Sequence, residues 1–109
     1  MALRFDEPTR LRLRSRLLRK GRAIAEKLAE LLAGKGGPVR LSDLPAFARK
    51  PGMRPEERLR AYLDHVENCR KLLDAGDDRF GRCTSCSDDL GLVALGDMPW
   101  ADRCQKCVP

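Results

Sequence analysis

Four cysteines near the carboxyl end of the chain have the spacing of a metal site. They form two Cys-x-x-Cys pairs, Cys83 with Cys86 and Cys104 with Cys107, separated by 17 residues. Two such pairs roughly 15–20 residues apart are typical of four-thiolate zinc sites. Zn–S bonds of about 2.3 Å to all four sulfurs complete a tetrahedron and leave no open position for catalysis. The sequence therefore predicts one structural Zn²⁺.

Other uses of these cysteines agree less well with the sequence. Two disulfides would suit a small secreted protein, but the arginine-rich amino-terminal region lacks the apolar core of a signal peptide. A redox motif needs one Cys-x-x-Cys pair, usually at the start of a helix in an α/β protein. An iron–sulfur cluster also takes four thiolates and stays an alternative. Thiolates that await zinc fit a reducing compartment, so we expect the protein in the cytoplasm.

The segment between the two cysteine pairs must leave the metal and return to it. Residues 90–95 are mostly apolar and are followed by Gly96 and Asp97, which predicts a short β-hairpin or an extended loop. A module of about thirty residues cannot fold by hydrophobic burial alone. Metal binding supplies its folding free energy, about 10–16 kcal/mol in small zinc modules. We therefore expect metal removal to unfold this end while the rest of the chain stays partly folded.

The first part of the chain has the pattern of a long amphipathic helix. Asp6 can cap it, with Glu7 and Pro8 in its first turn. Good helix formers continue to Ala33, and Gly34 is a candidate C-cap. Apolar residues recur at intervals of three and four: Leu11, Leu17, Leu18, Ile24, Ala25, Leu28, Leu31 and Leu32. The pattern predicts a helix of about 26 residues.

A second helix is predicted to begin at Pro55 and to end before Gly76. Its apolar stripe consists of Leu59, Tyr62, Leu63, Val66, Cys69 and Leu73. Residues 35–54 connect the two helices, and Ser42 or Asp43 can cap a short helix there that reaches Ala48. Two helices with one apolar stripe each predict an antiparallel pair, with the zinc module beside the start of the first helix.

The expected fold class is therefore mainly α. Residues 1–76 are predicted to form an antiparallel helical, coiled-coil hairpin with a tip loop at about 35–54. Residues 77–109 are predicted to form a small zinc ribbon. No apolar run approaches the roughly 20 residues of a membrane span, so we expect no membrane association.

Three other side chains could take part in chemistry. Cys69 lies on the apolar stripe of the second helix, where a free cysteine packs as a small hydrophobe; a fifth ligand or a redox role is the alternative. His65 lies beside that stripe, which favours exposure to solvent over metal binding. Trp100 precedes Cys104 by four residues. We expect it to shield the metal thiolates, or alternatively to anchor a partner.

Positive charge is concentrated in the first helix. The chain has a net charge of +6, and residues 10–22 contain seven basic residues and no acidic one. Such a run can bind phosphates or an acidic protein surface, or it can form a solvated helix face. The candidate contact residues are Arg12, Arg16, Arg19 and Arg22.

The cysteines belong to a longer pattern. Phe80 and Gly81 precede the first pair, apolar residues stand at Leu90 and Leu95, and Pro99 precedes the second pair. This pattern resembles the four-cysteine zinc finger of the DksA/TraR family over the last thirty residues. The chain departs from the family pattern at Ser87, where the family has glycine, and at Ala94, where it has arginine.

The resemblance implies a bacterial, non-enzymatic transcription regulator that binds RNA polymerase. In the DksA branch the helical hairpin enters the secondary channel of the polymerase, often in cooperation with guanosine tetraphosphate. Its tip has an Asp-x-x-Asp-x-Ala motif, to which Asp43, Ala46 and Ala48 correspond here, with alanine in place of the second aspartate. These three residues are the candidate tip contacts.

Two further functions fit the sequence. One is a zinc ribbon that binds nucleic acid through the arginine-rich helix, with an affinity that falls steeply with salt. Aromatic residues, on which bases stack in single-strand recognition, make up only 5% of the chain, which argues against recognition of single strands. The other is a zinc-stabilised protein-interaction module. We do not expect an enzyme, because the chain offers no nucleophile–base pair and no paired carboxylates in a plausible site.

Overall fold

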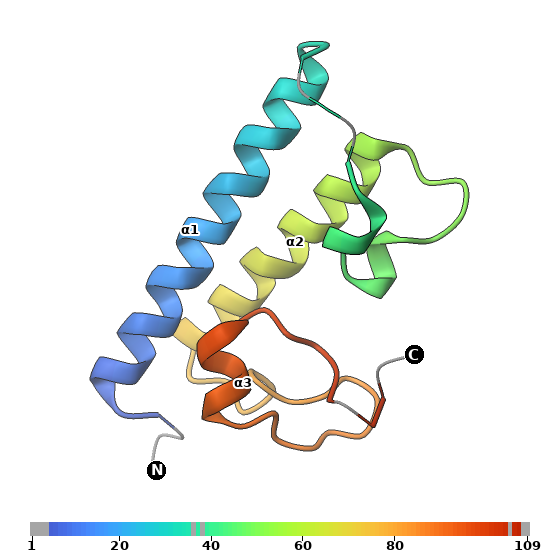
Figure 1. The fold of residues 1–109 in the computed structure, drawn as a ribbon. Helices are drawn as coiled ribbons and strands as arrows, with labels where there is room; N and C mark the ends of the chain where they lie inside the picture. Colours follow the sequence, from blue (N-terminus) through green and yellow to red (C-terminus); the bar gives the residue numbers. More distant parts are fainter. Residues whose placement is uncertain (1–4, 36, 38, 105, 108–109) are drawn as a thin grey trace.

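Two long helices packed against each other form the body of the protein (Figure 1). The computed structural model describes residues 5–35, 37, 39–104 and 106–107. Helix α1 spans Glu7–Leu32 and helix α2 spans Pro55–Asp74. Three short helical segments complete the elements: η1 (Leu41–Asp43), η2 (Ala46–Ala48) and α3 (Leu92–Asp97). The molecule measures 48 × 28 × 19 Å.

Local signals in the sequence set the ends of both long helices. The Asp6 carboxylate accepts a hydrogen bond of 2.9 Å from the Thr9 amide at the start of α1. At the end of α1 the amide of Gly34 donates to the Leu31 carbonyl and that of Lys35 donates to the Glu30 carbonyl. This is a Schellman motif, and Gly34 has the positive φ of 74° that the motif requires. Gly76 ends α2 in the same way, with a φ of 66°.

The contacts between α1 and α2 show that the helices run in opposite directions. Arg14, near the start of α1, donates to Asp74 at the end of α2, while Gly21 lies beside Leu63 and Val66. The buried residues of this seam are Leu13, Leu17, Ile24 and Leu28 on α1 and Leu59, Tyr62, Val66, Cys69 and Leu73 on α2.

The apolar stripe predicted for α1 is wrong at four positions. Leu11, Leu18, Ala25 and Leu32 are exposed, whereas Leu13, which the prediction omitted, is 3% exposed. An α-helix turns by about 100° per residue, so Leu11 lies about 160° around the axis from Leu13 and cannot face the same partner.

The connection between the helices folds back along α2 (Figure 1). Leu44 and Ala48 are buried in the core, and the Ala48 carbonyl accepts a hydrogen bond of 2.9 Å from Arg58 on α2. The single short helix expected here is instead two 3₁₀ turns separated by Pro45. A proline disfavours helical geometry in the preceding residue, and Leu44 is extended with φ −109° and ψ 148°.

The segment between the cysteine pairs contains a helix, so the predicted β-hairpin is wrong. Residues Leu92–Asp97 form α3, and the described part of the chain has no strand beyond an isolated bridge between Arg82 and Asp89. Gly91 starts the turn with a φ of 86°. One helical turn then places Leu95 in the core with no exposed surface and leaves Val93 86% exposed.

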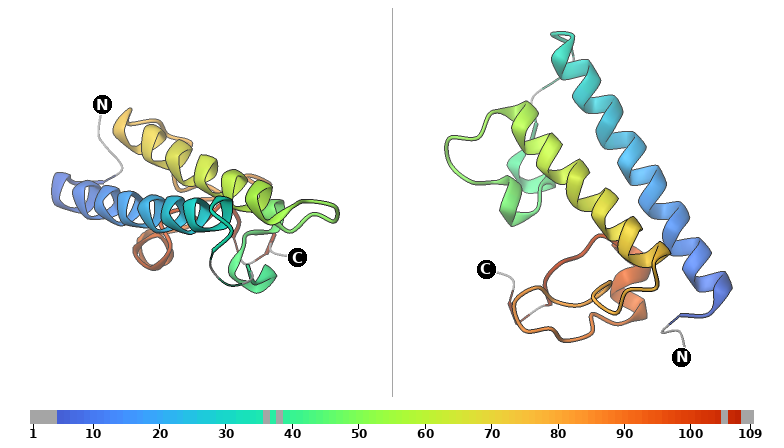
Figure 2. Two further views of the ribbon diagram at one scale, coloured as in Figure 1. Left: turned by 90° about the horizontal axis from the view of Figure 1, so that it is seen from above. Right: turned by 180° about the vertical axis from the view of Figure 1, so that it is seen from behind.

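The carboxyl-terminal module packs against the start of α1, as the order of the elements predicted. The rings of Phe5 and Phe80 meet edge to face with their centroids 5.8 Å apart. Arg16 donates a hydrogen bond of 3.0 Å to the Asp97 carbonyl at the end of α3. The left view of Figure 2 shows α3 and the connection on the same side of the α1–α2 pair. Within the described ranges, no helix combines the length and apolarity needed to cross a lipid bilayer.

Candidate metal centre

The sulfur atoms of Cys83, Cys86, Cys104 and Cys107 form one cluster. All four Sγ atoms lie within 4.8 Å of one another, and those of Cys86 and Cys104 are 3.6 Å apart. Four sulfurs at about 2.3 Å from a central ion stand about 3.8 Å apart in a tetrahedron. The cysteines are therefore positioned to bind a metal ion, as their spacing predicted.

Tight turns hold each pair of cysteines. In the first turn the Ser87 amide donates to the Cys83 carbonyl at 2.9 Å, and the Cys83 amide donates to the Asp88 carbonyl at 2.9 Å. Ser87 has a φ of 65° and is the one non-glycine residue with positive φ in the described part of the chain. In the second turn the Cys107 amide donates to the Cys104 carbonyl at 3.0 Å.

Thr84 ties the two turns together. Its amide and its hydroxyl both donate to the Asp102 carbonyl, at 2.8 and 3.1 Å. This cross-link brings the segment before Cys104 to the first cysteine turn, although the two are far apart in the chain. No pattern in the sequence predicted that Thr84 would link the two cysteine turns.

The electrostatics of the cluster favour a bound cation. Backbone N–H groups, first that of Cys104 and then that of Cys86, stabilise the Cys83 thiolate and lower its pKa to about 6. The hydrogen bonds of Cys107 with the side chains of Cys104, Cys83 and Cys86 raise its pKa to about 12. Four thiolates this close repel one another, and a divalent cation removes the repulsion because it supplies opposite charge to each.

Apolar residues of the carboxyl-terminal segment that holds the four cysteines, which we call the cysteine module, pack against the long helices. Phe80 and Leu95 belong to the same core as the α1–α2 seam, and Pro99 is fully buried. Trp100 packs against this core, and the Lys20 ammonium lies 5.0 Å from its ring centroid and 5.3 Å from that of Tyr62. Burial raises the pKa of the Tyr62 hydroxyl, and the neighbouring Trp100 side chain offsets this in part. The described contacts of Trp100 are thus with the helices, whereas the sequence predicted that it shields the thiolates.

His65 is half-buried, which corrects the expectation that it faces solvent. Its Nε2 lies 2.7 Å from the Trp100 carbonyl, so this nitrogen carries a proton and donates it. The ring of Phe47 from the connection packs against the other side of the imidazole, with centroids 4.9 Å apart. His65 therefore joins α2, the connection and the cysteine module.

Cys69 belongs to the core, as predicted. It is 8% exposed, and burial raises the pKa of its thiol to about 12. Its Sγ lies 3.6 Å from His65 Nε2, and it is not part of the four-cysteine cluster. Its role is packing rather than metal binding.

The structure separates the three candidate tip residues. Asp43 is exposed, and it lines a hollow beside Lys20, Lys27 and Tyr62. Ala48 has no exposed surface, so its side chain is not presented to a partner. The side chain of Ala46 lies outside the described residues. The connection lies along α2, and the far end of the molecule is the end of α1 (Figure 1).

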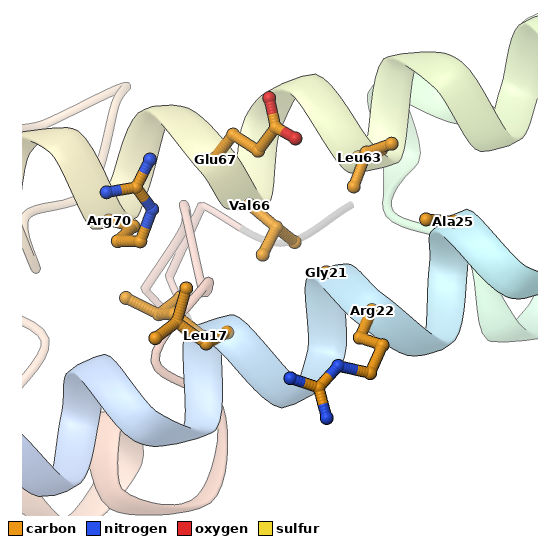
Figure 3. Close-up of a pocket in the computed structure, with 9 residues that line it drawn as sticks. Leu17, Gly21, Arg22, Ala25, Leu63, Val66, Glu67 and Arg70 are labelled. Atoms are coloured by element: carbon orange, nitrogen blue, oxygen red, sulfur yellow. The ribbon is translucent and has the colours of Figure 1, made fainter.

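The four candidate arginines do not form one surface. Arg12, Arg16 and Arg19 line hollows on the side of α1 that faces α3 and Trp100. Arg22 instead lines a separate hollow between α1 and α2, opposite Glu67 and Arg70 (Figure 3).

Comparison of the chain with protein-family models, curated proteins and solved structures gave no match. The resemblance to the DksA/TraR zinc finger therefore depends on the motif residues themselves. Their positions in the fold are the basis for the proposal that follows.

Proposed function

We propose that the protein is a zinc-stabilised, non-enzymatic regulator of the DksA/TraR kind that binds RNA polymerase. The observation that carries this proposal is the agreement between the motif and the metal centre. The four cysteines of the motif cluster around one point, and the motif's apolar residues Phe80, Leu95 and Pro99 are buried where the module joins the helices.

The conformation of Ser87 supports the proposal further. The DksA/TraR pattern has glycine after the first cysteine pair, and glycine is the residue that most easily adopts a positive φ. Ser87 has a φ of 65° at this position. The backbone requirement of the motif is thus retained although the glycine itself is replaced.

The bound ion in this proposal is Zn²⁺ with a structural role. Four thiolates are the ligand set of structural zinc and complete its tetrahedral coordination. Zinc would hold the two cysteine turns together and so set the angle between α3 and the long helices. Asp43, the exposed member of the three tip candidates, would contact the polymerase.

The test is binding of the zinc-loaded protein to nuclease-treated core RNA polymerase, measured by fluorescence anisotropy. We expect micromolar or tighter binding that a known secondary-channel factor displaces. Asp43→Asn should bind almost normally but change transcription less in a purified assay. Asp64→Asn, an equal change of charge on the exposed face of α2, is the matched control. A folded, zinc-loaded protein that fails to bind polymerase would disprove the proposal.

A further inference from the structure

Three hollows follow one another along α1. The first lies between α1 and α3 and includes Arg12 and Arg16. The second lies between α1 and Trp100 and also includes Arg16. The third lies between α1 and η1 and shares Lys20 and Ala23 with the second. Neighbouring hollows share these lining residues and therefore lie side by side along the helix, and we call the three together the α1 groove.

The α1 groove is strongly positive. Asp43 is the one carboxylate among its described lining residues. In the described part of the chain, Arg10 and Arg14 are paired with Glu7 and Asp74, but no ion pair neutralises the cations of the groove. These cations are Arg12, Arg16, Arg19, Lys20, Lys27 and Arg40.

The positive charges form a row rather than a single cluster. Arg12, Arg16 and Arg19 follow one another at about one helical turn, with a pitch of about 5.4 Å. From Arg12 to Lys27 the row extends about 22 Å at 1.5 Å per residue. A row of this length matches a linear polyanion with regularly spaced charges, whereas a single anion would use only one or two of these side chains.

An aromatic ring lies beside this row. Trp100 is half-buried and lines the second hollow, whose volume is about 480 Å³. The Lys20 ammonium lies 5.0 Å from the centroid of its indole ring. Proteins that bind single-stranded nucleic acids combine aromatic side chains with nearby cations, because the bases stack on the aromatic rings while the phosphates pair with the cations.

We propose that the α1 groove binds single-stranded nucleic acid. The phosphates contact the row of cations along α1, and one base packs against Trp100. This proposed binding of single-stranded nucleic acid is a function in addition to polymerase binding and does not depend on it. Residues of α1 line one side of the groove, and residues of α3, Trp100 and the connection line the other; the left view of Figure 2 shows that α3 and the connection lie on the same side of the α1–α2 pair.

The test compares two variants with the same loss of charge. Arg12→Gln/Arg19→Gln removes two cations of the groove, and both side chains are exposed. Arg22→Gln/Arg60→Gln removes two exposed cations that do not line it. Binding of the zinc-loaded proteins to a labelled twelve-residue oligothymidylate is measured by anisotropy between 50 and 200 mM salt. Circular dichroism and zinc content verify that each variant is folded.

We expect the groove variant to bind about 50-fold more weakly at 50 mM salt, while the control variant stays within about twofold of the unaltered protein. Each phosphate contact on a single strand contributes about −0.7 to the slope of log K against log salt concentration. Loss of two contacts should therefore flatten the slope by about 1.4. Trp100 is the only tryptophan in the chain, so the oligonucleotide should also quench its fluorescence.

Three results would overturn the inference. Equal loss in the two variants would mean that net charge alone drives binding. Binding of the same sequence as a duplex with equal or higher affinity would exclude a preference for single strands. Competition by polyglutamate at equal charge concentration would identify an acidic protein segment as the occupant. If the double variant does not fold, Lys27→Gln against the exposed Lys71→Gln gives the same comparison, with an expected loss of about eightfold.

Discussion

Removal of the metal should unfold the carboxyl-terminal module and leave α1 and α2 packed together. Within the described part of this module, regular structure is limited to the six-residue α3 and one isolated bridge. Helices this short are not stable alone in water. In small zinc modules the metal supplies about 10–16 kcal/mol of folding free energy. The α1–α2 seam has its own row of buried leucines and contains none of the four clustered cysteines.

The structure gives the size of the expected change. Helix α3 accounts for 6 of the 52 residues in α-helices, the others being the 26 of α1 and the 20 of α2. Chelation should therefore lower the circular dichroism at 222 nm by about 12%, since the signal follows helical content. Trp100 emission should shift to longer wavelength, because the indole leaves its contacts with Tyr62 and the core.

Thiol titration gives an independent readout of the same event. After chelation, four thiols should react promptly with an aromatic disulfide reagent. Cys69 should react only when the long helices separate, because it is buried and the pKa of its thiol is raised to about 12. Cys69→Ser should bind zinc normally, whereas Cys104→Ser should lose tight binding.

Two outcomes would refute this reasoning. Loss of most of the helical signal on chelation, with all five thiols reacting together, would show that the α1–α2 seam cannot stand without the module. Unchanged dichroism and tryptophan emission after complete metal removal would show that the cysteine cluster is not needed for the fold.

Two substitutions test the backbone arguments in the zinc-loaded protein by denaturant unfolding. Gly21→Ala should stabilise α1 by about 1 kcal/mol, because the added Cβ would meet Leu63 and Val66 at an ordinary contact distance of 3.8 Å; a destabilised variant would mean that the seam is tighter than the structure shows. Ser87→Gly should raise stability by up to about 1 kcal/mol, because a left-handed non-glycine residue costs about 1–2 kcal/mol and the greater freedom of glycine in the unfolded chain offsets part of the gain. A clear loss of stability in Ser87→Gly would show that the serine side chain, rather than the φ of 65°, determines this turn.

Several features of the fold could be predicted from the sequence because their causes are local. The cap at Asp6 and the glycines that end α1 and α2 act within one or two turns of the chain. The four-cysteine cluster could also be predicted from local features. A Cys-x-x-Cys turn already places two sulfurs side by side, and the second pair needs only to approach the first. The burial of Cys69 follows from the periodicity of one helix.

Other features depended on contacts between distant parts of the chain. A short apolar run such as residues 90–95 is compatible with a strand or a helix, and periodicity cannot distinguish them. In the structure this run contains the start of helix α3, and Leu95 is buried in the core of the long helices. Likewise, no local pattern showed that the connection would pack along α2, where Arg58 and His65 meet Ala48 and Phe47.

The sequence by itself determined where the long helices begin and end, and which four side chains could hold a metal ion. Only the tertiary structure decided which charges share a surface. The run of basic residues is continuous in sequence, but Arg22 lines the hollow between α1 and α2, whereas the other three candidates line hollows beside α3 and Trp100. Lys27, further along α1, and Arg40 from the connection lie beside them. Packing between separate segments decides that Arg40, Trp100 and α3 lie next to this row, and spacing along α1 cannot reveal it.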